Sequence, residues 1–153
     1  LCKKNLSMTP EEIWMRNPVI QKDEELGIYK EIFDDVINDL EKISCDNDII
    51  TEGCAYLPIL IKELGITDNK YLAIIRTKEF QVTHYQERQF VSYVLDGCSN
   101  KEKAFENWME RDFLFSKEIE RQCESNKLKI MINDGTTNLD DMVNEVVTHF
   151  GID

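Results

Sequence analysis

The sequence lacks the glycine-rich signatures of nucleotide-binding loops. Its 153 residues include only six glycines, and these are too dispersed to form a loop whose backbone N–H groups cradle a phosphate. Neither G-x-x-x-x-G-K-[ST] nor G-x-G-x-x-G occurs. The printed sequence therefore contains no recognisable triphosphate site.

Patterns for metal binding and disulfide frameworks are also missing. The five cysteines include no C-x-x-C pair, their count is odd, and the closest two are nine residues apart. His84 and His149 are the only histidines, which excludes a histidine-rich metal centre. We therefore predict no metal ligands and expect reduced, mostly packed thiols in the cytoplasm. A Cys–His nucleophilic pair stays open as an alternative.

No apolar run is long enough to cross a membrane, and basic residues are scarce. The 30 acidic residues against 18 basic ones give a net charge of −12, which argues against a surface that binds nucleic acid. Acids are concentrated in residues 11–52, whereas residues 76–129 are balanced. We expect an anionic ligand to meet this balanced stretch, which contains four arginines: Arg76, Arg88, Arg111 and Arg121.

The hydrophobic pattern predicts an α/β fold, in which a parallel sheet is flanked by helices in three α/β/α layers. Apolar residues recur at helical spacing or form short β-branched runs, and Leu139, Met142, Val143, Val146, Val147 and Phe150 form the expected inner face of the last helix. Ligands of such folds bind beyond the carboxyl ends of the strands. The predicted strands are 48–53, 70–77 and 128–134, and the predicted helices are a short one from Thr9-Pro10, then 22–43, 55–64, 78–95, 101–125 and one from Asn138.

Several polar residues at the predicted strand ends and on the helices are candidates for chemistry. Glu52 ends the first strand, where a carboxylate could hold a hydrated metal ion or accept a proton; the alternative is a solvated acid in a turn. Arg88 shares a helix face with Phe80 and His84 and could bind a phosphate, or simply lie on the surface. Asp112 lies on an apolar helix face, so it either meets an arginine across a helix interface or marks a helix break or exposed lid.

Two further positions are less distinctive. Arg111, beside Asp112, turns to an adjacent helix face and could meet an anionic ligand. The run Asp134-Gly135-Thr136 follows the last strand and is suited either to the edge of a ligand crevice or to an ordinary turn that leads into a helix.

Taken together, residues 8–18, 50–58, 77–88, 105–112 and 133–136 resemble the later two-thirds of a P-loop kinase of the nucleoside-monophosphate-kinase-like superfamily. The similarity is greatest to a bacterial branch often described as ATP-binding or AAA-domain proteins. It extends over nearly the whole chain, with the blocks in the right order.

The resemblance implies ATP-dependent phosphoryl transfer with Mg²⁺ to a nucleotide or other small-molecule acceptor. It implies that Glu52 lies near the metal and the transferred phosphoryl group, and that Arg88 and Arg111 belong to a lid over the phosphates. Asp134, Gly135 and Thr136 would border the adenine, and Arg16 would border the acceptor. In this interpretation residues 8–45 form the acceptor-side helical insert, 46–77 and 126–153 the sheet core, and 78–125 the helical lid.

The family's first strand and phosphate-binding loop would precede Leu1. The resemblance therefore implies a longer natural protein, with residues 1–153 as the C-terminal two-thirds of one domain and inactive alone. The alternative is a non-catalytic α/β module that serves binding or assembly without nucleotide.

Overall fold

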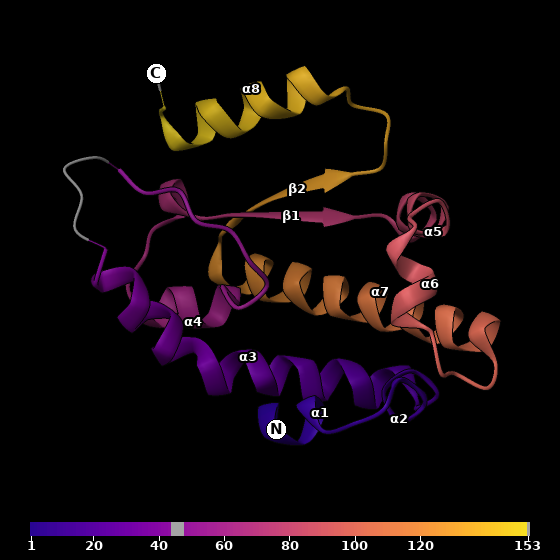
Figure 1. Cartoon of the computed structure of the whole chain (residues 1–153). Helices are drawn as coiled ribbons and strands as arrows, with labels where there is room; N and C mark the ends of the chain where they lie inside the picture. Colours follow the sequence, from indigo (N-terminus) through magenta and orange to yellow (C-terminus); the bar gives the residue numbers. More distant parts are fainter. Residues whose placement is uncertain (44–47, 153) are drawn as a thin grey trace.

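The computed structural model describes residues 1–43 and 48–152, and helices make up most of them (Figure 1). The α-helices are α1 (Cys2–Leu6), α2 (Pro10–Trp14), α3 (Pro18–Glu41), α4 (Pro58–Glu63), α5 (Lys78–Gln86), α6 (Phe90–Val94), α7 (Lys101–Asn126) and α8 (Leu139–Phe150), with a 3₁₀ helix, η1, at Asp68–Lys70. The strands are β1 (Leu72–Arg76) and β2 (Lys129–Asn133).

The predicted three-layer α/β/α fold is wrong, because the chain is mostly helical and the described residues contain only a two-stranded sheet. The two strands do pair in parallel, as predicted, with Leu72 opposite Lys129 and Arg76 opposite Asn133. The predicted first strand at 48–53 has no regular structure, and Ile50 is 73% exposed. A short β-branched run forms a strand only where another strand satisfies its backbone groups, and this run has no such partner among the described residues.

Helix α7 runs through the middle of the molecule and carries most of its core (Figure 1). Ile119 of α7 packs with Leu26 of α3 and with Ala73 of β1. Leu57, the residue before α4, belongs to the same cluster. A second cluster surrounds Trp108, nearer the start of the same helix. Each large side chain buried in this way contributes about 1.5–3 kcal/mol by leaving water, so α3 and α7 form the stable frame of the fold.

Helix α8 lies on the other side of the sheet from α7 (Figure 1) but buries none of its residues fully. The prediction that its apolar face is buried is wrong, since Leu139 is 75% and Val143 50% exposed. Across the sheet, Ile74 and Ile132 are also half exposed. The third layer is therefore not packed, which is the physical reason why the three-layer description fails.

The remaining differences concern where elements begin and end. Helix α3 starts at Pro18, four residues earlier than predicted, because the Asn17 side chain accepts a hydrogen bond from the N–H of Val19. The predicted helix 78–95 divides into α5 and α6. The expected start of the short helix at Thr9 is confirmed by a capping box with Glu12. The predicted boundary between 8–45 and 46–77 lies outside the described residues.

Among the described residues, no helix has both the length and the apolar character that crossing a membrane requires.

Candidate functional site

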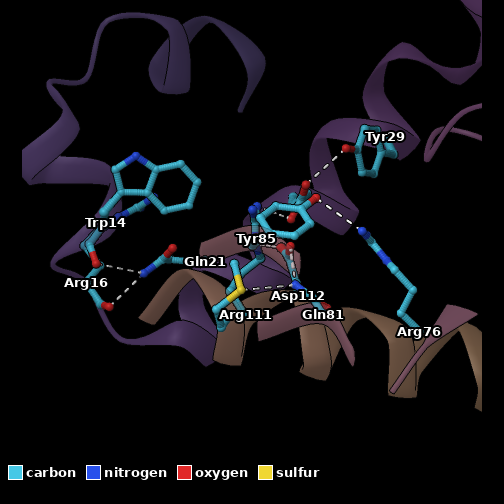
Figure 2. A network of polar contacts seen from close by, with 11 residues as sticks. Trp14, Arg16, Gln21, Tyr29, Arg76, Gln81, Tyr85, Arg111 and Asp112 are labelled. Atoms are coloured by element: carbon cyan, nitrogen blue, oxygen red, sulfur yellow. Dashed lines mark hydrogen bonds and ion pairs between the residues drawn. The ribbon is translucent and has the colours of Figure 1, made fainter. Parts of the chain in front are cut away.

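A network of charged and polar side chains joins α3, α5 and α7 (Figure 2). At its centre, the guanidinium of Arg111 donates to Glu25 Oε2, and its Nε lies 2.6 Å from Asp112 Oδ1. That second contact is ionic, because the Nε–H does not point at a hydrogen-bonding partner. Both ion pairs are well shielded, with 14% of the Arg111 side chain and 17% of the Asp112 side chain exposed.

Asp112 is held by a second helix as well. The Gln81 amide, 2% exposed, donates to Asp112 Oδ2 at 2.8 Å. Burial raises the pKa of Asp112 to about 6, with Arg111 opposing the shift and Glu25 adding to it. Neither alternative left open for Asp112 is observed: its arginine partner is Arg111, the preceding residue of the same helix and not one across a helix interface, and α7 continues through this position without a break.

Glu25 connects the network to α3. Its Oε1 accepts a hydrogen bond of 3.0 Å from the hydroxyl of Tyr29, one helical turn later. Burial, with the nearby charge of Glu25, raises the pKa of the Tyr29 phenol, so this hydroxyl stays protonated and donates at neutral pH. Both oxygens of Glu25 are thus occupied within the protein.

A cavity of about 240 Å³ lies beside this network, between α1, the end of α2, α3 and α7. Arg16 reaches it from the turn after α2, where its guanidinium pairs with Glu24 and donates to the carbonyl of Ile13. The lining residues are Asn5, Ile13, Trp14, Arg16, Gln21, Glu25, Ile28, Tyr29 and Arg111.

Trp14 fixes one wall of the cavity. Its ring stacks on Trp108 at a centroid distance of 4.7 Å, and the guanidinium carbon of Arg111 lies 5.2 Å from the Trp14 centroid. Stacking and cation–π attraction together hold α2 against α7. Arg16 and Arg111, two of the site residues predicted from the sequence, both border this cavity. Each of them is already paired with a carboxylate.

A second group of charges lies at the carboxyl end of β1. The guanidinium carbons of Arg76, the last residue of the strand, and Arg88, in the turn after α5, lie 5.2 Å and 4.8 Å from the centroid of the Tyr85 ring. Arg76 also donates to the Tyr85 hydroxyl at 3.4 Å. Within the part of the chain that the structure describes, neither arginine forms an ion pair.

The loop after β2 lies at the same end of the sheet. The N–H and hydroxyl of Thr136 donate to Asp134 Oδ1 at 2.9 and 2.7 Å, and these bonds lower the pKa of Asp134. Gly135 has a φ of 84°, and a Cβ there would lie 2.7 Å from the ring of Phe80. The loop is therefore a tight turn packed against α5, with Asp134 as an acceptor inside it.

Glu52 lies apart from these groups. It is exposed in the irregular segment before α4, and no hydrogen bond or ion pair of this side chain occurs among the described residues. The described residues also contain no group of three acidic, histidine or cysteine side chains that could hold a metal ion.

The structure therefore separates the predicted residues into three places: Arg16 and Arg111 at the cavity, Arg88 and the Asp134 loop at the sheet end, and Glu52 alone. Sequence reasoning missed the buried glutamines Gln21 and Gln81, since glutamine is common on exposed helix faces and carries no periodic signal. Comparisons with protein-family models, with curated proteins and with solved structures find no match for this chain.

Proposed function

We propose that the chain recognises a phosphate-bearing small molecule at the carboxyl end of its sheet and serves in ATP-dependent phosphoryl transfer. The observation that carries the proposal is the pair Arg76 and Arg88, which share the ring of Tyr85 without a carboxylate partner among the described residues.

The geometry suits an anion with several acceptor oxygens. Since each guanidinium carbon is about 5 Å from the same centroid, the two lie within about 10 Å of each other. Guanidinium groups present forked N–H donors that match phosphate oxygens. Tyr85 is itself braced by Trp108, edge-to-face at 5.6 Å, so the ring offers both arginines a fixed support.

The proposed role in phosphoryl transfer rests on the family resemblance described above. The part of this chemistry that we assign to the chain is binding of the phosphate groups. Arg76 and Arg88 would hold phosphate oxygens and offset the negative charge that the phosphoryl group carries. Arg111 is engaged by Glu25 and Asp112, so we assign it to the adjoining cavity. Glu52 remains a predicted catalytic residue without a described partner.

Titration calorimetry of the 153-residue chain with ADP, ATP·Mg²⁺ and inorganic phosphate tests the proposal. We expect R88Q and R76Q each to weaken binding about tenfold or more, as for loss of one charge-assisted hydrogen bond of about 1.5–3 kcal/mol. R121Q is the matched control, because Arg121 is exposed and already paired with Glu118. Unchanged binding in the double variant R76Q/R88Q, or no binding of any of the three ligands, would contradict the proposal.

A second candidate function is a non-catalytic assembly module, favoured by the apolar side chains that the sheet and α8 leave in solvent. In this case the face that carries Ile74, Ile132 and Val143 would bury itself against a second copy of the chain. Light scattering distinguishes the candidates: a concentration-dependent dimer that I132D dissociates, without nucleotide binding, favours assembly over phosphate recognition.

A further inference from the structure

We infer that an apolar face beside α8, called here the free face, binds a basic, amphipathic helix of a partner protein. The free face consists of one side chain of β1 and three of α8: Ile74, Leu139, Val143 and Val147. Binding there is independent of the proposed phosphate site, because it uses neither of the two arginines of that site. The occupant also differs from the second copy of the chain considered above.

Helix α8 has two rows of apolar side chains, and only one of them is covered. The first row is partly buried: Met142, Val146 and Phe150. The second row, at the same spacing of four residues, is 75%, 50% and 37% exposed: Leu139, Val143 and Val147. An apolar stripe of this width indicates a helix that packs against more than one neighbour. Of the α-helices that the structure describes, α8 is the only one on its side of the sheet (Figure 1).

The second row lies on the flank of α8 that is nearer to β1. Glu145 pairs with Lys129 of β2 at 3.0 Å, so its flank of the helix is the one nearer to β2. At about 100° per residue, Val143 and Val147 lie on the opposite side of the first row from Glu145. A helix placed over β1 would therefore lie directly against the second row.

The sheet itself is covered over β2 and open over β1. Ile74 and Met131 are opposite each other in the register, so their side chains lie on the same side of the sheet. This is the α8 side, because the adjacent residues Ala73 and Ile130 pack in the core around α7. Met131 is 5% exposed, whereas Ile74 is 52% exposed. One helix over β1 would complete this layer, since parallel sheets are normally covered on both faces.

A helix suits the free face better than a strand does. A strand that paired with the open edge of β1 would lie in the plane of the sheet and leave the second row of α8 in water. A helix beside α8, at the usual axis separation of about 8–10 Å, would contact this row and Ile74 together. Its own apolar side chains would have to form one stripe, which makes the occupant amphipathic.

The charge around the free face indicates that this helix is basic. Residues 130–153 contain five acidic residues and no lysine or arginine. Asp140 is exposed and lies one helical turn before Val143, at the rim of the free face. Lys129 of β2 is already paired with Glu145. Lysine or arginine side chains beside the apolar stripe of the partner would therefore meet complementary charge, whereas acidic ones would be repelled.

The same charges disfavour a second copy of the chain. In a two-fold dimer through the free face the two α8 helices would come together, and each brings Asp140, Asp141 and Glu145. Each copy also carries a net charge of −12. Like charges placed across an interface weaken association, so the occupant that we infer is a different protein.

The test is fluorescence anisotropy of labelled synthetic helices of about 18 residues, titrated with the 153-residue chain at about 150 mM salt. The first peptide has leucine on one face and lysine on the other. The second has glutamate in place of lysine, and the third has the residues of the first in an order that forms no apolar face. We expect saturable binding of the first peptide and at least tenfold weaker binding of the others. No saturable binding of the first peptide, or equal binding of all three, overturns the inference.

Matched variants test whether the peptide binds at the free face. V143N and I74N each replace an exposed apolar side chain, and we expect at least tenfold weaker binding of the lysine peptide. I20N is the control, because Ile20 of α3 is 53% exposed and lies in the acidic stretch 11–52. V143N keeps the test valid if circular dichroism shows that I74N does not fold. Wild-type affinity in folded V143N, or an equal loss in I20N, overturns the site.

Light scattering of the chain alone tests the identity of the occupant. We expect a monomer in the absence of peptide. A concentration-dependent dimer that V143N dissociates would show that a second copy covers the free face, and it would overturn the inferred partner. Phosphate binding is measured separately with R76Q/R88Q, so that the phosphate site and the free face can each fail without the other.

Discussion

The two sides of the sheet differ in how their helices meet it. Below the sheet in Figure 1, α7 buries seven of its residues, among them Trp108, Ile119 and Cys123. Above it, α8 has a clear apolar stripe but buries none of its residues fully. Of the two helices α8 has the stronger apolar stripe, so the difference in burial lies in the partner: α7 packs against α3, α4 and the strands, whereas α8 meets mainly η1.

Polar contacts show the same contrast. Under the sheet, the buried Gln81 amide donates to Asp112 inside the protein. On the other side, α8 is held by exposed or part-buried contacts: His149 Nε2 donates to the carbonyls of Asp68 and Tyr71 at 3.0 and 2.9 Å, and Glu145 pairs with Lys129. We therefore expect the α3–α7 side to determine global stability and the α8 side to open locally.

The largest expected effect is the loss of an aromatic anchor under the sheet. Trp108→Ala removes a 6%-exposed ring that contacts Trp14, Tyr85 and Phe90, and it should lower the free energy of unfolding by about 4 kcal/mol. Leu139→Ala on α8 should change it by less than about 0.5 kcal/mol. Urea unfolding followed by circular dichroism measures both, and equal losses would contradict the contrast between the two sides.

The next effect concerns the shielded ion pairs. Arg111→Met leaves Glu25 and Asp112 facing each other without their cation, so we expect a loss of about 3 kcal/mol in the same unfolding measurement. The matched control is Arg121→Met on the outer surface of α7, where 63% of the arginine side chain is exposed. That exposed pair should contribute at most about 1 kcal/mol. A similar loss in both variants would show that burial of the network adds nothing.

A smaller effect follows from the titration of Asp112. Its pKa of about 6 lies above the ordinary value of 3.8, so the folded protein holds this proton more tightly than the unfolded chain does. The contribution of Asp112 to stability is therefore greatest below pH 4, falls as the pH rises from about 4 to 6, and stays low above that. Over this window wild type should lose about 2 kcal/mol relative to D112N.

The measurement is the difference in unfolding free energy between wild type and D112N at several pH values from 4 to 7. The other carboxyl groups, including Glu118 with its pKa lowered to about 2 by Arg121, are common to both proteins and cancel in the difference. A difference that does not vary with pH would mean that Asp112 titrates normally.

Local sequence signals predicted local structure well. The capping box at Thr9 and Glu12 and the apolar runs of the two observed strands each depend on residues close in the chain. Burial depends on distant partners, which is why the run 48–53 and the inner face of α8 were predicted wrongly. The three-layer fold fails for the same reason: periodicity identifies a face that can be buried, and tertiary packing decides whether it is.

The candidate site was predictable in part. Charge patterning directed attention to the arginines of residues 76–129, and an anionic ligand there stays a prediction; the structure shows that Arg76 and Arg88 share one aromatic ring. The cavity could not be predicted, because its essential groups are the backbone carbonyls of Trp14 and Arg16 and the Gln21 amide they orient. Because every residue has a backbone carbonyl, the sequence does not show which carbonyls will orient a side chain.

The smallest expected effect compares two helix caps of the same chemistry. Asn17 caps α3 through a 2.9 Å bond from the Val19 N–H, and Asn138 caps α8 through a 2.9 Å bond from the Asp141 N–H. An asparagine cap contributes about 1 kcal/mol to its own helix. That energy counts toward global unfolding only if the helix opens together with the core. Asn17→Ala should therefore lower global stability by about 1 kcal/mol.

Asn138→Ala should leave global stability within about 0.5 kcal/mol of wild type and speed amide hydrogen exchange in α8 alone, because α8 can fray while α3 and α7 stay packed. Hydrogen exchange resolved by residue measures this directly. If Asn138→Ala instead speeds exchange in α7 as much as in α8, the two sides of the sheet unfold as one unit. The exposed apolar stripe of α8 would then belong to the cooperative core despite its contact with solvent.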